Sequence, residues 1–388
     1  MPSAGEDRVE SNTATLRDVL VSPARAEPNN LPVGGVAWPV GAPSWVHQRR
    51  YGAVVEPPSF EPDHPTATID RASYAGYGTA HFGHFVSEHA SRVPDAQRFE
   101  PRGRFILVAR PKQYGGSVPQ FAYEVLEWLG VSPERVHVVA EETTLVHELV
   151  VWPAQEQPGT TPSERYLDVL DDNTARKKLA PIRSEVVYVS RSGMRHRASG
   201  EAYLDRVLAA AGVTVIHPES LSVREQLARY AGAQNLIFSE GSSMHGRQLI
   251  GRVDQRIAVL QRRKGGVFGR DFLSPRCSSL TIVDALHCSI PLSFRFDMAG
   301  PKMWEAFPLL DEDALLDALC SLGVDLRGRW RPDEFETAVA EDMSEWARWI
   351  ARAYPREDPG PKIAMALEVL EESGQQRFSP AILSAFDR

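Results

Sequence analysis

Residues 186–191 read Val-Val-Tyr-Val-Ser-Arg, an apolar run that is followed at once by polar residues. A short unbroken run of β-branched and aromatic residues is typical of a strand that is buried on both faces, as in a parallel sheet. The polar loop that follows, residues 190–197, therefore leaves the C-terminal end of a buried strand. The rest of the fold can be worked out from this strand and its loop.

Helices and strands alternate after this strand. We expect a helix, a strand, a helix, a strand, a polar loop, a short helix and a last strand at residues 201–211, 213–217, 222–231, 235–239, 240–243, 244–250 and 256–261. Such alternation predicts right-handed βαβ crossovers and a parallel sheet. In such a sheet the ligand crevice lies beyond the C-terminal ends of the strands, where the loops 190–197 and 240–243 fall.

The N-terminal half predicts a second α/β unit. An apolar strand at 105–109, a helix at 119–130 and a strand at 136–139 make a βαβ unit. A charged helical segment at 161–179 connects the two halves. Residues 31–65 are rich in proline and glycine and are expected to lie as extended segments over a domain surface.

The length of the chain, 388 residues, fits two domains of ordinary size. Trp346 and Trp349 lie three residues apart in a helical pattern and are expected to pack in a core or a domain interface. The predicted division is a disordered or loosely attached N-terminus (1–30), an N-terminal α/β domain (31–175), a C-terminal Rossmann-like domain (176–300) and a helical segment that packs on the domains (301–388).

Composition excludes several classes of protein. The net charge of −8 argues against a general nucleic-acid binder, because neutralising phosphates needs a basic surface. Cys277, Cys288 and Cys320 form no CxxC pair, which argues against a disulfide or zinc scaffold and favours a reducing compartment. The first 30 residues lack a signal-peptide core and no apolar run is long enough for a membrane span. We expect a cytoplasmic protein and leave peripheral membrane association open.

The turn Glu240-Gly241-Ser242-Ser243, with His245 just beyond it, is a candidate anion site. Between a strand and a helix, free backbone N–H groups and hydroxyls lie at the positive end of the helix dipole, which suits a phosphate. The alternative is that a serine caps the helix and Gly241 only permits the turn. The turn lacks the glycine spacing of a dinucleotide fingerprint or a P-loop.

The neighbouring loop offers the cations that a diphosphate requires. Arginine can hold a phosphate through two parallel hydrogen bonds, so one arginine can neutralise a leaving diphosphate without a metal. Arg191 is the first choice because it lies nearest the strand, and Ser190 and Arg195 are weaker candidates. The alternative is that most of these arginines are solvent-exposed residues of a basic turn and bind no ligand.

His81, His84 and Glu88 form a candidate general-base group. On a helix that starts near residue 82, His84 and Glu88 lie one turn apart on the same face. A carboxylate at that distance can orient an imidazole and raise its basicity. The alternatives are ordinary packing histidines or a zinc site, although there is no HExxH pattern. No paired-carboxylate motif is placed to hold a metal nucleotide, so we expect a metal-independent mechanism and no cofactor.

These segments resemble glycosyltransferase family 61, which includes bacterial capsular-polysaccharide biosynthesis proteins. The resemblance covers residues 70–265 and departs at 240–242, where many members read His-Gly-Ala, and at Gly200, where asparagine is common. It rests on short motifs in the order of the family, at 81–88, 188–191, 200–201, 218–222, 225–226 and 231–243.

The resemblance implies a GT-B architecture, two Rossmann-like domains that face each other across a cleft. It implies inverting, metal-independent transfer of a sugar from a nucleotide-sugar donor to a glycan or another hydroxyl acceptor, as in capsular or extracellular polysaccharide biosynthesis. In this interpretation His84, supported by Glu88 and His81, is the base, while Arg191 and residues 241–243 hold the donor phosphates. Ser190, Arg195, Glu240 and His245 are weaker candidates for the ribose or a phosphate. The alternatives are a nucleotide-sugar epimerase, a polysaccharide pyruvyl transferase or a non-catalytic scaffold of a capsule-assembly complex.

Overall fold

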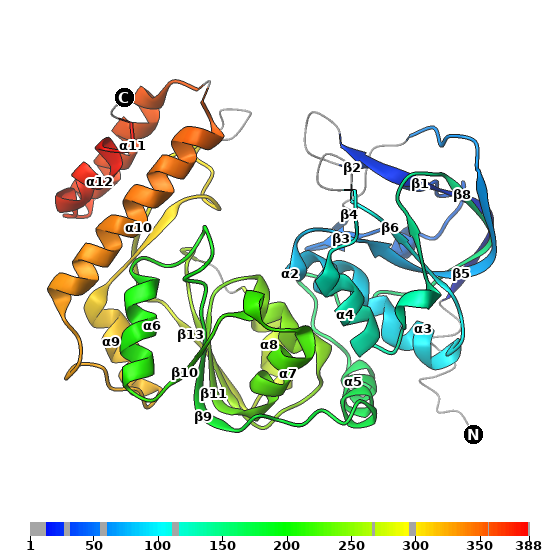
Figure 1. Cartoon of the computed structure of the whole chain (residues 1–388), viewed down its shortest axis with the longest axis horizontal. Helices are drawn as coiled ribbons and strands as arrows, with labels where there is room; N and C mark the ends of the chain where they lie inside the picture. Colours follow the sequence, from blue (N-terminus) through cyan, green and yellow to red (C-terminus); the bar gives the residue numbers. More distant parts are fainter. Residues whose placement is uncertain are drawn as a thin grey trace.

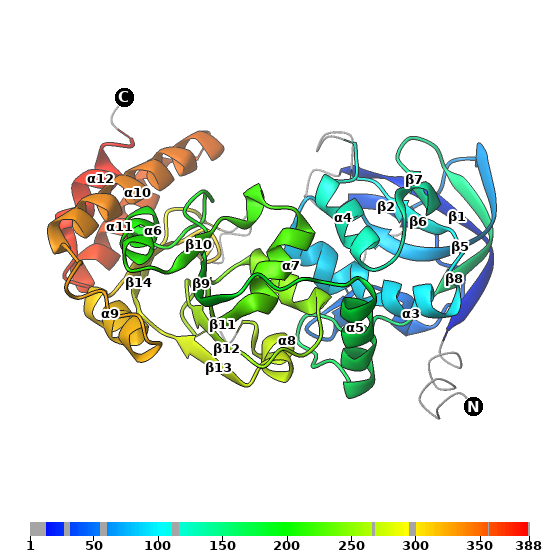
Figure 2. The same cartoon turned by 60° about the horizontal axis from the view of Figure 1, so that its bottom comes forward.

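The computed structural model describes residues 13–26, 32–54, 60–110, 116–265, 268–294, 300–355 and 357–386. Within them, two large sheets with helices on their faces lie side by side, and a group of C-terminal helices lies beyond the second sheet (Figure 1). The same order is seen when the molecule is turned (Figure 2). This arrangement agrees with the α/β class predicted from the sequence.

The second sheet is wholly parallel, with the order β10-β9-β11-β12-β13. The chain therefore crosses from β9 to β10 on one side and then returns to β11 on the other. Doubly wound sheets of this order bind ligands at the point where the direction reverses, here between β9 and β11. The elements are β9 (Ser184–Val189), α6 (Glu201–Ala210), β10 (Thr214–Ile216), α7 (Val223–Gly232), β11 (Ala233–Ser239), η7 (Ser242–Leu249), β12 (Arg256–Leu260), α8 (Arg270–Leu273) and β13 (Ser279–Val283).

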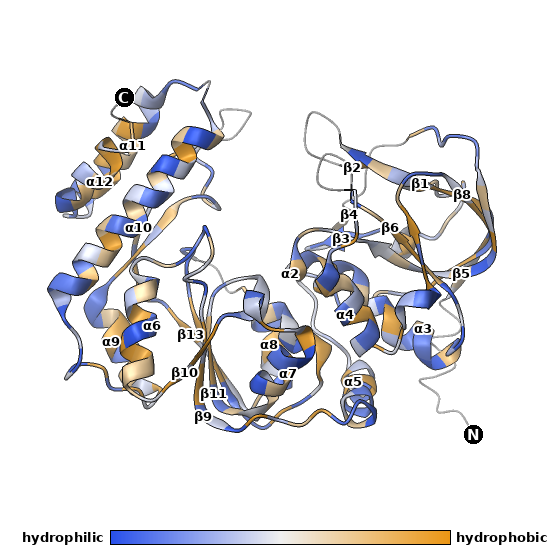
Figure 3. Ribbon diagram, viewed as in Figure 1, coloured by the Kyte–Doolittle hydropathy of each residue, from blue (hydrophilic) through white to orange (hydrophobic). Residues whose placement is uncertain are grey.

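Consecutive residues of β9 enter different cores. Val187 and Val189 belong to the core on the side of the N-terminal sheet, whereas Val186 and Tyr188 belong to the core beneath the C-terminal helices. Side chains alternate between the faces of a strand, so a strand covered on both faces must be apolar throughout. Figure 3 shows the same distribution for the sheet as a whole, with apolar residues in the strands and hydrophilic residues on the outer faces of the helices.

The first sheet is mixed, with the order β2-β1-β8-β5-β6-β7. β5 pairs in parallel with β8 and β6, and β1 and β2 extend the β8 edge as antiparallel strands. A small hairpin, β3 (Arg49–Arg50) and β4 (Ala53–Val54), lies apart from the sheet. The sheet strands are β1 (Ala14–Ala26), β2 (Pro32–Val36), β5 (Ala67–Tyr77), β6 (Phe105–Val108), β7 (Val136–Val139) and β8 (Thr144–Val151).

The prediction of a loosely attached N-terminus is wrong for residues 13–26. These residues include β1, in which Val19 and Val21 are buried against the sheet. Charged residues and a proline interrupt the apolar pattern of this strand, and Asp18 has a positive φ of 51°, so the period of two is not evident in the sequence. The other residues of the predicted segment, 1–12 and 27–30, lie outside the described part of the chain.

The helices of the N-terminal lobe cover the side of the sheet that faces the second lobe. The helix expected from residue 82 is present, but most of it is a π-helical turn, a feature that is frequent at functional sites. The helices are α2 (Phe82–His84), the π-turn η2 (Phe85–His89), η3 (Ala90–Arg92), α3 (Val93–Phe99), α4 (Gln120–Trp128) and the connector α5 (Glu164–Arg176).

The C-terminal segment packs on the outer face of the second sheet. Trp346 is buried and its ring lies against Phe307, so it packs within the chain as expected. None of the helices in the described ranges combines the length and the apolar character that a membrane span requires. The elements are β14 (Leu286–Ile290), β15 (Phe307–Leu310), α9 (Glu312–Ser321), α10 (Pro332–Ala353), α11 (Pro359–Glu372) and α12 (Ser379–Leu383).

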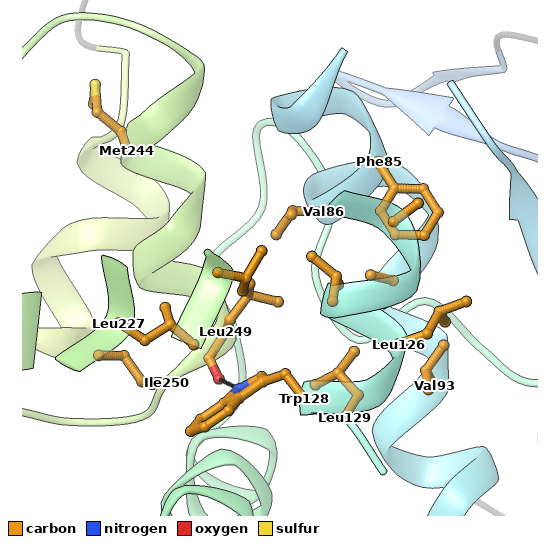
Figure 4. Close-up of a cluster of buried hydrophobic side chains, with 14 of the residues drawn as sticks. Phe85, Val86, Val93, Leu126, Trp128, Leu129, Leu227, Met244, Leu249 and Ile250 are labelled. Atoms are coloured by element: carbon orange, nitrogen blue, oxygen red, sulfur yellow. Dashed lines mark hydrogen bonds between the residues drawn. The ribbon is translucent and has the colours of Figure 1, made fainter. Parts of the chain in front are cut away.

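One hydrophobic core joins the two sheets. Phe85 and Val86 of the first lobe belong to the same buried cluster as Leu227 and Ile250 of the second (Figure 4). The indole Nε1 of Trp128 donates a hydrogen bond of 2.7 Å to the carbonyl oxygen of Leu249 across this junction. Burial of apolar surface stabilises the contact between the lobes as well as each lobe.

A fully buried ion pair reinforces this junction. The guanidinium of Arg276, in the second lobe, donates to both carboxylate oxygens of Glu156, in the first lobe, at 2.9 and 2.7 Å. Both side chains are almost completely shielded from solvent, at 0% and 1% exposure. Arg276 also donates to the carbonyl oxygens of Phe272 and Ile250, so its charge is well satisfied.

We predict that Glu156→Gln lowers the free energy of unfolding by about 3–5 kcal/mol, because it leaves the buried charge of Arg276 without its counter-ion. Urea denaturation followed by tryptophan fluorescence measures the change. Asp317→Asn is the matched control, because it removes the exposed pair between Asp317 and Arg327 and should leave the midpoint unchanged. Equal midpoints for the two variants would contradict the prediction.

Candidate functional site

A cavity of about 430 Å³ lies between the lobes beyond the C-terminal ends of β9 and β11. This is the reversal point of the parallel sheet, where ligands of such folds bind. The second lobe contributes Ser190, Arg191, Ser242 and Ser243, four of the residues predicted to hold donor phosphates. Phe82, Gln120, Phe121 and Glu124 of α2 and α4 form the opposite wall.

The Arg191 guanidinium lies directly against Gly241. A Cβ atom on Gly241 would come within 2.0 Å of Arg191 Nη1, so this position has room only for glycine. Arg191 Nε and Nη2 donate to the carbonyl oxygen of His196 at 3.4 and 3.3 Å. No described carboxylate forms an ion pair with Arg191. Burial lowers the pKa of Arg191, and the charges of Glu201, Glu240 and Glu219 act in the opposite direction. An arginine stays charged in proteins, so the cavity wall carries a cation that has no direct ion pair with a described carboxylate.

The turn at 241–243 offers two backbone donors. The N–H groups of Ser242 and Ser243 have no hydrogen-bond acceptor among the described residues. The N–H of Gly241, by contrast, is directed at the sulfur of Met244 at 3.4 Å. Of the predicted phosphate-binding residues, Gly241 therefore lets the Arg191 guanidinium lie close to the turn, while Ser242 and Ser243 supply the free N–H donors.

Glu201 and Asp205 of α6 hold the loop that carries Arg191. Glu201 Oε1 accepts the backbone N–H of Arg191 at 2.8 Å and the hydroxyl of Tyr188 at 2.9 Å. The hydroxyl of Ser190 donates to Asp205 at 2.8 Å. Burial raises the pKa of Asp205 to about 6, although its hydroxyl partners act in the opposite direction. Ser190 thus lies in the wall of the cavity with its hydroxyl already engaged by the protein.

Helix α10 anchors the far side of the same loop. The guanidinium of Arg195 lies 4.6 Å from the ring centre of Trp349, and the ring of His196 meets this indole edge-on at 5.3 Å. Arg197 donates to Asp342 at 3.0 and 2.8 Å. Arg195, a weaker candidate for donor contact, therefore faces α10 and does not line the cavity.

The predicted pair of His84 and Glu88 is formed. Their Nδ1 and Oε1 atoms are 2.5 Å apart, one helical turn from each other. Arg50 of the β3 strand donates to both oxygens of Glu88 at 3.0 Å, and Gln48 donates to the same carboxylate. Burial alone would raise the pKa of Glu88, but the hydrogen bond from His84 and the neighbouring positive charges outweigh it and lower this pKa to about 2. Glu88 is therefore a carboxylate at neutral pH.

His81 lies between this pair and the anion-binding loop. Its ring centre is 4.4 Å from that of His84, and its Nδ1 accepts the backbone N–H of His84 at 3.4 Å. Part of the ring is open to solvent, but desolvation by the surrounding protein and the charges of His84 and Arg191 lower the pKa of His81 to about 4. The imidazole is therefore neutral at neutral pH. The cavity is not lined by His81, His84 or Glu88. Phe82 is the residue of this helical segment that lines it.

Gly83 is the point at which the two halves of the site touch. A Cβ atom on Gly83 would lie 2.5 Å from Cδ2 of His245 and 3.1 Å from Cβ of Ser242. Helix α2 therefore lies directly on η7, and this contact sets the distance between the His84 pair and the anion-binding turn. The family motif at 81–88 contains this glycine, although sequence reasoning assigned no role to it.

Glu240 and His245 belong to a second pocket of about 300 Å³. The buried carboxylate of Glu240 accepts the backbone N–H groups of Arg262 and Arg263 at 2.8 and 3.2 Å and pairs with the guanidinium of Arg263. The structure thus divides the predicted donor-binding residues. Arg191, Ser190, Ser242 and Ser243 face one cavity, whereas Glu240 and His245 face another.

Two residues of the site have no signal in the sequence. Arg50 and Gln48 lie in a proline- and glycine-rich stretch that was expected only to cover a surface, yet they bind Glu88. Glu201 had a signal, since it follows the strand and loop at the first turn of a helix, but its role in holding Arg191 was missed. The part of the chain that the structure describes contains no group of three or more His, Cys, Asp or Glu residues arranged as a metal site.

Residues 82–247 match the model of the protein family described as Glycosyltransferase 61. The matched segment begins at α2 and ends in η7, so it includes His84, Glu88, Arg191 and the turn at 241–243. No curated protein matches the chain. Over these residues the chain is similar to glycosyltransferase family 61, a family of transferases.

We predict that Gly83→Ala destabilises the protein by about 1–3 kcal/mol, because the added methyl group overlaps His245 and forces the lobes apart. Without that contact, alanine in a helix would be more favourable than glycine. Thermal unfolding measures the effect. Gly328→Ala is the matched control, because the new methyl group would enter open space. A Gly83→Ala protein at least as stable as the wild type would show that α2 and η7 are not in contact.

Proposed function

We propose that this chain is an inverting glycosyltransferase that moves a sugar from a nucleotide-sugar donor to a hydroxyl acceptor, in capsular or extracellular polysaccharide biosynthesis. The observation that carries the proposal is the Arg191 guanidinium, which has no ion pair among the described residues, beside the free N–H groups of Ser242 and Ser243. These groups lie at the reversal point of a parallel sheet, which suits a diphosphate. The proposal includes a GT-B arrangement, with the two lobes on opposite sides of the donor.

The diphosphate of the donor would rest against Arg191 and the two backbone donors. As the bond between the anomeric carbon and the phosphate oxygen breaks, negative charge grows on the leaving diphosphate. Fixed N–H donors and a guanidinium stabilise that charge without having to reorganise. Glu201 keeps the Arg191 backbone in place, and the carbonyl of His196 orients its side chain.

The acceptor hydroxyl would be activated by His84. When the Nδ1–H of His84 donates a hydrogen bond to Glu88, Nε2 carries the lone pair and can accept a proton. The hydroxyl oxygen attacks the anomeric carbon, its proton passes to Nε2, and the nucleoside diphosphate leaves with the bonding electrons. A single displacement of this kind inverts the configuration at the anomeric carbon. Glu88, held as a carboxylate, stabilises the imidazolium that results.

No cofactor is part of the proposal, and the nucleotide sugar is a co-substrate. The charge of the leaving group is assigned to Arg191 and the backbone amides, so we propose a metal-independent reaction, which an assay with and without EDTA tests. Nucleotide sugars for polysaccharide assembly are present in the cytoplasm, so we propose that the enzyme is cytoplasmic. Cell fractionation tests whether it is also attached to the membrane surface.

Arg191→Ala should weaken nucleotide binding by about tenfold to a hundredfold, the loss expected for one charge-assisted contact, and should lower turnover. A thermal-shift panel of UDP, GDP, CMP and dTDP identifies the nucleotide first, and titration then gives the affinity of each variant. Arg206→Ala removes an exposed arginine on the outer side of α6 and is the matched control. If no nucleotide stabilises the wild-type protein, the non-catalytic scaffold gains support and the proposal fails.

His84→Ala should lower turnover by about 10²–10⁴-fold, the usual contribution of a general base, with little change in nucleotide affinity. Release of the nucleoside diphosphate from the sugar donor measures turnover. His64→Ala is the control, since His64 is exposed and lines neither pocket. Wild-type turnover in His84→Ala would remove His84 from the mechanism.

Product analysis distinguishes a glycosyltransferase from the two alternative enzymes, a nucleotide-sugar epimerase and a polysaccharide pyruvyl transferase. Only a glycosyltransferase creates a new glycosidic bond. An epimerase returns the nucleotide sugar with one inverted centre, and a pyruvyl transferase adds a ketal to an existing glycan.

A further inference from the structure

The second pocket has a different chemical character from the anion cavity. Its volume of about 300 Å³ is at the lower end of small-molecule sites, enough for one sugar ring. The turn at 240–242 separates the two spaces, because Glu240 lines the second pocket and Ser242 lines the first. The lining of the second pocket includes Tyr51, Ser87, Glu240, His245, Arg263 and Asp271.

The charges that line this pocket do not favour an anion. Arg263, the cation in its wall, is paired with Glu240, and the Glu240 carboxylate also holds two backbone N–H groups. The remaining charged group is the exposed carboxylate of Asp271. A phosphate or a uronic acid would therefore meet a neutralised arginine and an additional negative charge. Neutral ligands are favoured by comparison.

His245 lines this space, and the Cδ2–Nε2 edge of its ring lies beside Gly83 of α2. Its side chain is 94% buried, and its Nδ1 lies 2.5 Å from Oε1 of Gln248, which fixes Nδ1 as the donor and Nε2 as a bare acceptor. Nε2 has no hydrogen-bond partner among the described residues. Burial lowers the pKa of His245 to about 4, so the ring is neutral at neutral pH. A neutral imidazole nitrogen in this position can accept a hydrogen bond from a ligand hydroxyl.

Tyr51 supplies an exposed aromatic surface at the rim. It lies at the tip of the β3–β4 hairpin, where its backbone N–H donates to the carbonyl of Pro158 at 2.9 Å, yet its side chain is 66% exposed. One edge of the ring lies against Gly159, and much of the rest is open to solvent beside the pocket. An aromatic face beside hydroxyl-binding groups suits the apolar C–H face of a sugar ring.

The pocket adjoins the proposed base. Ser87, which lines it, precedes Glu88 in η2, and Arg50, which contacts His84, precedes Tyr51 in the hairpin. On the other side, His81 stacks on His84 and is close enough to Arg191 to be affected by its charge. The His84 pair is therefore near residues of both the anion cavity and the second pocket, although it lines neither.

We propose that the second pocket binds the acceptor, and that the acceptor presents a neutral sugar residue which stacks on Tyr51 and donates a hydroxyl hydrogen bond to Nε2 of His245. This inference rests on the proposed glycosyl transfer, because it gives the substrate class of the same site. It also gives the N-terminal hairpin a function, since the hairpin supplies both Tyr51 and the Arg50 contact to Glu88.

Saturation-transfer NMR tests the proposal on the full chain with millimolar methyl β-galactoside, methyl β-xyloside, methyl α-mannoside and methyl β-glucuronide, in the presence of the nucleoside diphosphate from the thermal-shift panel. At least one neutral glycoside should bind, and more tightly than the glucuronide. Tyr51→Ala should weaken that binding about tenfold, whereas Tyr51→Phe should retain it. Nucleotide affinity should be the same in all three proteins.

A second variant addresses charge selection. Asp271→Asn should narrow the preference for neutral glycosides over the glucuronide, since it removes the unpaired carboxylate from the rim. If the wild-type protein binds no nucleotide, the proposed glycosyltransferase function is refuted. Nucleotide binding without any glycoside signal, a preference for the glucuronide, or equal glycoside binding by wild type and Tyr51→Ala would overturn only the assignment of this pocket.

Discussion

The site depends on one physical constraint, the direct contact of α2 with η7. Gly83 has no side chain, so the backbone of α2 can lie against His245 and Ser242. The shared apolar core and the buried pair of Glu156 and Arg276 hold the lobes in this position. Since these contacts are desolvated, separating the lobes would expose apolar surface and a charge. The proposed base and the anion-binding loop are therefore held at a fixed distance even without ligand.

Within this frame, the pairing of charges distinguishes the two pockets. Arg276 at the lobe junction is engaged by Glu156, and Arg263 in the second pocket is engaged by Glu240. Arg191 instead donates to a backbone carbonyl and has no direct ion pair among the described residues, so its guanidinium can pair with a ligand anion. A protein that buries a cation without a counter-ion gives up stability at that point. Such a cost is expected where a ligand supplies the missing charge.

Sequence reasoning succeeded where structure is determined locally. The strand at 186–189, the loops after β9 and β11 and the pair of His84 and Glu88 follow from hydrophobic runs and helical spacing, which nearby residues determine. It failed for β1, where tertiary pairing with β8 overrides a broken pattern. It also missed Arg50, because no local period connects a hairpin residue to a carboxylate 38 positions later. Glu240 and Ser242 line different pockets because the turn directs their side chains differently, and the order of residues does not reveal these directions.

The titration behaviour of the histidines explains why the anion site must rely on arginine. Desolvation lowers the pKa of His81, His196 and His245 to about 4 in each case. These rings, which surround the loops at both pockets, are therefore neutral between about pH 5 and the alkaline range. A cleft in which these three imidazoles were charged would attract a second phosphate to the acceptor side. With these imidazoles neutral, Arg191 is the cationic group among the described residues that line the anion cavity. The site can therefore use charge to separate an anionic donor from a neutral acceptor.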